Sequence, residues 1–232
     1  MLEILYEDNH IIAVNKKSGD IVQGDETGDT PLSEYVKAYI KEKYAKPGDV
    51  FLGVVHRLDR PVSGVVLFAR TSKALTRLNE LFKTKDIEKT YWAVVKNLPQ
   101  KNGILQTAGT LTHYHQKNEK LRKAKLFDKE VAHTKKCILH YQLLHSTTHY
   151  FLLQIQLETG RFHQIRAQLS KVGAPIKGDV KYGYERPNEN SRSIHLHARK
   201  ITFDHPIKKE KIEIIAPLPT ETVWNLFSEQ ST

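Results

Sequence analysis

The sequence has 232 residues, of which 39% are hydrophobic, so it is long enough to build a sizeable core in one domain. Charged residues make up 27%, close to the average for soluble proteins, which argues against disorder except at the ends. The formal charge is +10, which favours a polyanionic partner such as nucleic acid, with a generic basic surface as the alternative.

The first part of the chain predicts short strands and two helices. Apolar runs predict strands at 2–6, 10–15, 51–55, 64–69 and 90–95. Thr30 and Pro31 predict a helix start, with a capping hydroxyl followed by proline in the first turn. A second helix is predicted to begin at Thr71. The Gly- and Asp-rich loop around 19–28 lacks the spacing of a phosphate-binding loop.

The second part of the chain is dominated by predicted strands. We predict strands at 138–144, 150–157, 194–203 and 211–215, helices at 162–172 and 220–227, and irregular loops with edge strands over 100–130. This mixed order predicts an α+β fold, a mixed and largely antiparallel sheet flanked by helices and loops. With no repeat and no clear linker, one domain over 1–232 is the simplest interpretation.

Targeting and redox signals are absent from the sequence. The single cysteine, Cys137, excludes a disulfide framework, argues against a cysteine-based zinc site and fits a reducing cytoplasm. The N-terminus lacks the basic start and apolar run of a signal peptide, and no stretch approaches the roughly 20 apolar residues that span a bilayer. We therefore expect a soluble, cytoplasmic protein with no membrane partner.

The polar loop at 56–63 is the most informative segment. Asp59 follows Arg57 by two residues, between two predicted apolar strands. Loops held by rigid strands often carry catalytic groups. The alternative is that Arg57 and Asp59 simply pair and pin the loop, since many ion pairs are structural.

The amino-acid sequence of this loop resembles the motif of a known family. Residues 56–64 read His-Arg-Leu-Asp-Arg-Pro-Val-Ser-Gly. This resembles the signature of the RluA family of pseudouridine synthases, His-Arg-Leu-Asp, two variable residues, then Thr-Ser-Gly. Further blocks resemble the family in the same order, at 5–16, 89–95, 159–166, 175–183 and 196–198. The resemblance covers about residues 2–216.

The resemblance implies both a fold and a set of site residues. The fold is a single pseudouridine-synthase-type domain with a central active-site cleft. The implied catalytic residues are Asp59, Tyr91 and Arg166. The implied substrate-binding residues are Arg57, His56 and Leu196.

The implied roles compete with simpler ones. Arg166 is expected to keep Asp59 ionised, because a nearby cation lowers a carboxyl pKa; otherwise it contacts a phosphate. Tyr91 offers a face to the extruded base and a hydroxyl near carbon 5, or else is a core tyrosine. Arg57 is expected to fill the gap left by the base, or to bind phosphate. Leu196 is expected to form an apolar wall near the base.

The family's reaction breaks the N-glycosidic bond of a uridine, rotates the base and rejoins it through carbon. No electrons are transferred overall, so no redox cofactor, nucleotide triphosphate or other cofactor is expected. Asp59 acts as a nucleophile or a base, and the sequence leaves open attack on the sugar, attack on the base, and elimination to a glycal. The expected substrate is a structured RNA, rRNA or tRNA, and the expected state is a monomer.

Three departures from the family pattern stand out: Lys17 for proline, Val62 for threonine and Gln168 for histidine. None removes a catalytic group, although Val62 takes a hydroxyl from the loop. The chain also begins at the catalytic block, so the N-terminal S4 domain of many relatives is expected to be absent. That feature and the His-Arg-Leu-Asp-Arg-Pro form resemble the subgroup that acts on tRNA.

Two other functions compete with an RNA-modifying isomerase. One is a catalytically silent RNA-binding module on the same fold, which would be free to lose the three catalytic residues. The other is a glycosidase, which normally needs two carboxylates across one bond. The histidines at 113–149 lack the spacing of a metal site, so no metal is expected. The basic stretch 117–136 is expected to contact RNA backbone or to be a solvated loop.

Overall fold

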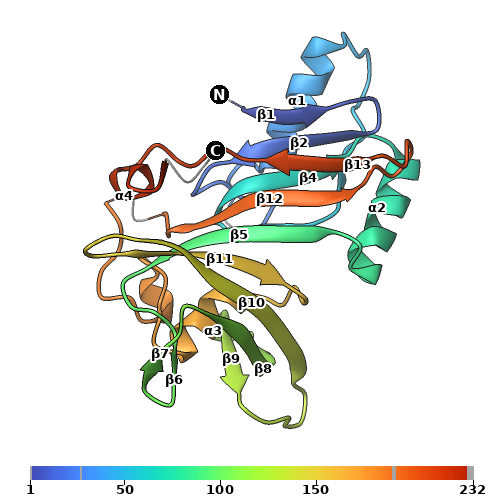
Figure 1. Cartoon of the computed structure of the whole chain (residues 1–232). Coiled ribbons are helices and arrows are strands. Elements are labelled where there is room, and N and C mark those ends of the chain that lie inside the picture. Colours follow the sequence, from blue (N-terminus) through green and yellow to red (C-terminus); the bar gives the residue numbers. More distant parts are fainter. Residues whose placement is uncertain (1, 27, 190–191, 229–232) are drawn as a thin grey trace. The chain divides into compact units, whose positions relative to one another are not determined.

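The computed structural model describes residues 2–26, 28–189 and 192–228. The chain folds as two compact units, the first of residues 1–89 and 198–219 and the second of residues 90–197 and 220–232. Both combine antiparallel strands with helices, which confirms the α+β prediction (Figure 1). One domain over the whole chain and a central cleft stay predictions. None of the helices within the described part of the chain is long and apolar enough to cross a membrane.

The first unit is a sheet with two helices. Its strands are β1 (Ile4–Glu7), β2 (Ile11–Lys16), β3 (Gly53–Val54), β4 (Ser63–Ala69), β12 (Leu196–Asp204, in this unit from Ala198 on) and β13 (Lys211–Ile215). The order is β1-β2-β4-β12, with β3 on β4 and β13 on β12. The helices are α1 (Leu32–Lys43) and α2 (Ser72–Thr84).

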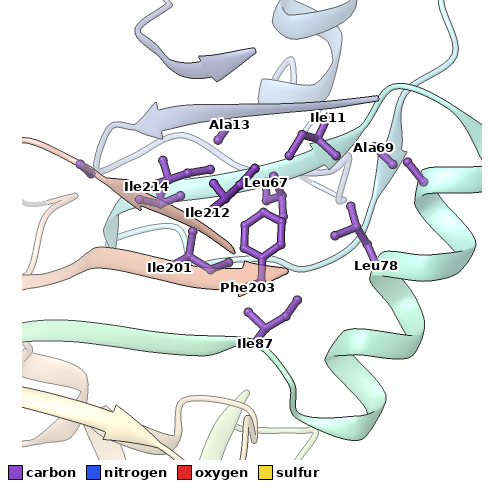
Figure 2. Packing of buried hydrophobic residues seen from close by; sticks show 13 residues of the cluster. Ile11, Ala13, Leu67, Ala69, Leu78, Ile87, Ile201, Phe203, Ile212 and Ile214 are labelled. Carbon is purple, nitrogen blue, oxygen red and sulfur yellow. The ribbon is translucent and has the colours of Figure 1, made fainter. Parts of the chain in front are cut away.

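One apolar cluster holds the first unit together. Leu67 of β4, Leu78 of α2 and Phe203 of β12 are fully or almost fully buried, and side chains from β2 and β13 converge on them (Figure 2). Burying one such side chain stabilises the fold by about 1.5–3 kcal/mol. This packing makes β4 a rigid support for the loop that precedes it.

The two helices of this unit begin in different ways. Thr71 caps α2, because its side chain accepts a hydrogen bond from the Ala74 amide, as predicted. The predicted Thr30 cap is wrong: Pro31 occupies the capping position of α1 without a side-chain hydrogen bond. The carbonyl of Ile21 instead accepts from the Leu32 amide at 2.7 Å. A backbone carbonyl from the glycine-rich loop therefore replaces the hydroxyl.

The second unit is also built on antiparallel strands. In spatial order they are β5 (Glu88–Val95), β11 (Phe151–Leu157), β10 (Lys135–Ser146), β8 (Ala108–Asn118) and β9 (Lys123–Phe127), while β6 (Gln100–Lys101) and β7 (Ile104–Leu105) form a separate hairpin. The prediction of irregular loops with edge strands over 100–130 is wrong for β8, which lies between β10 and β9 and pairs with β10 over eight residues. Its residues are mostly polar and exposed, so no apolar alternation marks it.

Three short helical segments complete the second unit: α3 (Gln164–Lys171), a 3-10 turn (Val180–Tyr182) and α4 (Thr222–Asn225). Gln168, the departure from histidine, is fully buried in α3. Its side-chain nitrogen donates to the Leu111 carbonyl at 3.0 Å and to His113 Nδ1 at 3.1 Å. The glutamine therefore ties α3 to β8 by its side chain.

Candidate active site

Asp59 lies half-buried in the loop between β3 and β4, as the sequence predicts. Its backbone carbonyl accepts from the Val62 amide at 3.0 Å, which closes a tight turn directly before β4. Arg57 is exposed, and Leu58 between them is buried. The buried Leu58 side chain thus anchors the loop, and Asp59 lies shortly before the first residue of the rigid strand β4.

Lys16 of β2 holds this loop in place through hydrogen bonds, a role that the sequence did not reveal. Its side chain is 1% exposed, and Nζ donates to the carbonyls of Lys17 at 2.9 Å, Arg60 at 3.0 Å and Val62 at 2.7 Å. Burial lowers the Lys16 pKa to about 8, against the opposing charges of Asp20 and Asp59. The ammonium therefore interacts electrostatically with Asp59 while it holds two carbonyls of the turn, those of Arg60 and Val62.

We expect Lys16→Met to lower the free energy of unfolding by about 1–3 kcal/mol, because three carbonyls lose their donor. Lys17→Met is the matched control, since Lys17 is exposed. Folding lowers the Lys16 pKa, so its contribution to stability rises as the pH increases from about 8 toward its ordinary value of 10.5. Urea unfolding at several pH values tests both points; equal midpoints for the two variants would contradict the role of Lys16.

His56 extends the contact between β3 and β4 by a side-chain hydrogen bond. Its Nε2 accepts from the Leu67 amide of β4 at 2.9 Å, directly after the two residues through which β3 pairs with β4. An accepting nitrogen carries no proton, so the proton of the neutral ring sits on Nδ1. The ring also stacks on Phe82 of α2, with centroids 5.0 Å apart. The side chain thus continues the strand pairing where the backbone turns away, and substrate binding by His56 stays a prediction.

We expect His56→Phe to lose about 1–3 kcal/mol of stability, because stacking survives but the Leu67 amide is left without an acceptor. His56→Gln, which offers an oxygen near the same position, should lose less. Burial lowers the His56 pKa to about 3, so its contribution is lost as the pH falls from about 6.5 toward 3. Denaturant unfolding at pH 7 and pH 5 measures this; equal stability of both variants would disprove the acceptor role.

The second unit carries Tyr91, Arg166 and Leu196. Tyr91 lies half-buried on β5, paired with Ile155 of β11. Leu196 is buried at the start of β12. Arg166 is buried in α3. The structure therefore places three predicted residues in each unit: His56, Arg57 and Asp59 in the first, Tyr91, Arg166 and Leu196 in the second.

Arg166 is held by a carboxylate that the sequence interpretation did not assign to the site. Its Nε donates to Asp179 Oδ2 at 2.7 Å and its Nη2 to Oδ1 at 2.9 Å. The two side chains are 5% and 1% exposed. This two-point contact fixes the plane of the guanidinium and turns its Nη1 edge away from Asp179. The expected pairing of Arg166 with Asp59 stays a prediction.

A short segment connects the predicted residues of the second unit. The Lys177 amide donates to the Val94 carbonyl of β5 at 2.9 Å, and the His195 amide donates to the Lys177 carbonyl at 2.9 Å. Asp179 follows two residues later. The segment therefore runs between the strand of Tyr91 and the residue before Leu196, and it delivers Asp179 to Arg166. Its place in the block at 175–183 was the one signal in the sequence.

The buried histidines of this unit act as hydrogen-bond partners. His115 Nε2 donates to the Phe162 carbonyl at 2.8 Å, and His113 Nδ1 contacts the Gln168 side chain. Burial lowers the pKa of both. Among residues 2–26, 28–189 and 192–228, no group of three His, Cys, Asp or Glu side chains lies close enough to hold a metal ion.

Known proteins resemble this chain over nearly its whole length. A tRNA pseudouridine synthase C of Vibrio cholerae serotype O1 is 32% identical over 99% of this chain and 96% of its own length. One of Pectobacterium carotovorum is 31% identical over 97% of this chain, which spans 60% of that relative. A ribosomal large subunit pseudouridine synthase C of Rickettsia bellii is 33% identical over 94% of this chain and 68% of its own length.

The fold has a solved counterpart as well. The structure of human RNA Pseudouridylate Synthase Domain Containing 4 matches 99% of this chain and 92% of its own chain, with a TM-score of 0.76 and 23% identity. The family model of RNA pseudouridylate synthases matches residues 10–171, which include Asp59, Tyr91 and Arg166. The chain therefore belongs to the RNA pseudouridylate synthase family, as its resemblance to the RluA group predicts.

Proposed function

We propose that this protein isomerises uridine to pseudouridine in a structured RNA, tRNA or rRNA, with Asp59 as the catalytic carboxylate. The observation that carries the proposal is the match of residues 10–171 to the family model. The structure supports it, because Lys16 holds the loop of Asp59 by hydrogen bonds and the buried strand β4 follows that loop directly. Such anchoring holds a reactive group in one geometry before substrate arrives. The proposed location is the cytoplasm, and the proposed state is a monomer.

The proposed roles of the site residues are those that the family resemblance implies. Asp59 supplies the carboxylate, Arg166 its cationic partner, and Tyr91 the ring that receives the extruded base. Arg57, exposed on the same loop as Asp59, enters the space that the base leaves. Leu196 forms the apolar wall. Asp179 supports this arrangement because it fixes the orientation of Arg166.

Tritium release tests the proposed reaction directly. When carbon 5 of uracil becomes bonded to the sugar, its hydrogen leaves, so RNA labelled with tritium at carbon 5 releases label to water. Purified protein should release tritium from bulk tRNA or rRNA transcripts, and a pseudouridine map with and without the gene should identify the position. Tight RNA binding without any release would favour the silent RNA-binding module.

Tyr91→Phe is expected to bind RNA with nearly unchanged affinity, because the ring face for stacking remains. Its single-turnover rate should fall by about 10²-fold or more, since loss of a proton-transferring group usually costs 10²–10⁴-fold. Tyr114→Phe on β8 is the matched control and should keep its rate. An unchanged rate for Tyr91→Phe would remove the hydroxyl from the mechanism.

A further inference from the structure

Two aromatic rings stack against each other directly before α3. Phe162 and His163 lie with their ring centroids 3.8 Å apart and an angle of 19° between the planes. Both side chains are half-buried, so part of this stack faces solvent. Phe162 has no role in the reaction proposed above, so this partly exposed aromatic stack close to Arg166 has no assigned function.

The stack is held rigidly from several sides. The Phe162 carbonyl accepts from His115 Nε2 at 2.8 Å, and His163 Nδ1 lies 2.9 Å from the Tyr182 hydroxyl. His163 adopts a left-handed backbone conformation with φ of 52°, which is uncommon for a residue other than glycine. Such strain persists only where the surroundings enforce it, and it concentrates at functional sites.

Lysine side chains mark the open side of this stack. Lys117 Nζ lies over the Phe162 ring, 5.1 Å from its centroid, and this side chain is 43% exposed. Phe162 itself is half-buried, so the ring and the ammonium above it are both partly accessible to solvent. Lys117 also pairs with the exposed Glu119 at 2.7 Å, and an exposed pair of this kind is weak and easily exchanged. Lys123 lies in the same way over Tyr182.

The stacked rings are neutral, whereas the side chains around them are mostly basic. Burial, followed by the nearby charges of Arg166 and Lys181, lowers the His163 pKa to about 3, so this ring is neutral at neutral pH. The neighbouring β8–β9 hairpin and the residues beside it carry the basic side chains of Lys117, Lys120, Arg122, Lys123, Lys125 and Arg161. A neutral aromatic surface bordered by cations matches the composition of single-stranded nucleic-acid sites.

We propose that Phe162, backed by His163, is a stacking platform for the base of an unpaired nucleotide, with Lys117 engaging the adjacent phosphate. This inference rests on the proposed function, because it assigns an RNA loop to the surface beside the active site. The base takes the place of the Lys117 ammonium over the ring. The ammonium then exchanges Glu119 for a phosphate oxygen.

The test uses a uridine hexamer and an abasic hexamer with the same backbone, bound to protein that carries Asp59→Asn so that no turnover occurs. Phe162→Ala should weaken hexamer binding by roughly 5- to 100-fold, the range expected for one stacked base. Binding of the abasic hexamer should not change. Phe162→Leu, which preserves bulk, guards against a folding defect and should behave like Phe162→Ala. Phe162→Trp should retain affinity, with tryptophan fluorescence quenched by the uridine hexamer alone.

Phe127→Ala is the matched control, because Phe127 is also half-buried with a lysine over its ring, Lys125 at 4.8 Å. It should bind both hexamers like the parent protein. Equal binding of the uridine hexamer by Phe162→Ala and the parent would overturn the proposal, as would no binding by the parent. If binding depends on Phe162 but the protein with Asp59 intact releases no tritium from tRNA or rRNA transcripts, the platform stands and the proposed enzyme is refuted.

Discussion

Asp59→Asn is expected to abolish pseudouridine formation and to lower the single-turnover rate by at least about 10⁴-fold, the scale of the loss when an essential catalytic side chain is removed. Asparagine has the shape of aspartate but is neither a nucleophile nor a base at neutral pH. The turn that carries residue 59 depends on its backbone carbonyl and on Lys16, not on its carboxylate. The variant should therefore fold and bind RNA like the parent.

The matched control is Asp29→Asn, since Asp29 forms an exposed ion pair with Arg60 of the same loop. It removes a negative charge near the turn without touching the proposed catalyst, and its tritium release should stay within about twofold of the parent, as expected for an exposed pair. Because the Asp59 charge raises the Lys16 pKa, Asp59→Asn should lower that pKa further. Substantial turnover by Asp59→Asn would refute the assignment.

The elements best predicted from the sequence are those whose apolar residues form a buried face of the strand or helix. The strands β2 and β4 and the hairpin of β10 and β11 are apolar on at least one face, so their periodicity shows. The strand β8 was missed because its polar side chains face water. The capping of α1 was mispredicted because a backbone carbonyl from a distant loop replaced the expected hydroxyl, and sequence does not show such tertiary contacts.

The sequence predicted the site residues that a motif identifies, but not the contacts that hold those residues in place. Lys16 and Asp179 also stand in recognisable blocks, but their roles depend on contacts across 46 and 13 residues of sequence. A buried lysine is improbable from composition alone, since lysine is almost never fully buried unless paired. Only the structure shows that three backbone carbonyls accept hydrogen bonds from the buried Lys16 ammonium. It also shows that the Asp179 carboxylate fixes the orientation of Arg166.

Asp179→Ala is expected to lower the free energy of unfolding by about 3–5 kcal/mol, because it leaves the buried Arg166 guanidinium without its counter-charge. Asp128→Ala is the control, since Asp128 pairs with Lys171 on the surface and is 76% exposed. Its loss should cost no more than about 1 kcal/mol. Denaturant unfolding separates the two; a small effect of Asp179→Ala would mean that the bridge contributes little to the fold.

The double variant Arg166→Met with Asp179→Leu separates stability from catalysis. Replacing a buried ion pair by apolar side chains of similar volume is often neutral for stability, so most of the loss seen in Asp179→Ala should be recovered. Turnover should not recover, because the Arg166 guanidinium, the proposed cationic partner of Asp59, is still missing. A stable double variant that still forms pseudouridine would show that Arg166 serves only the fold, and that another cation, such as Lys16, supports the carboxylate.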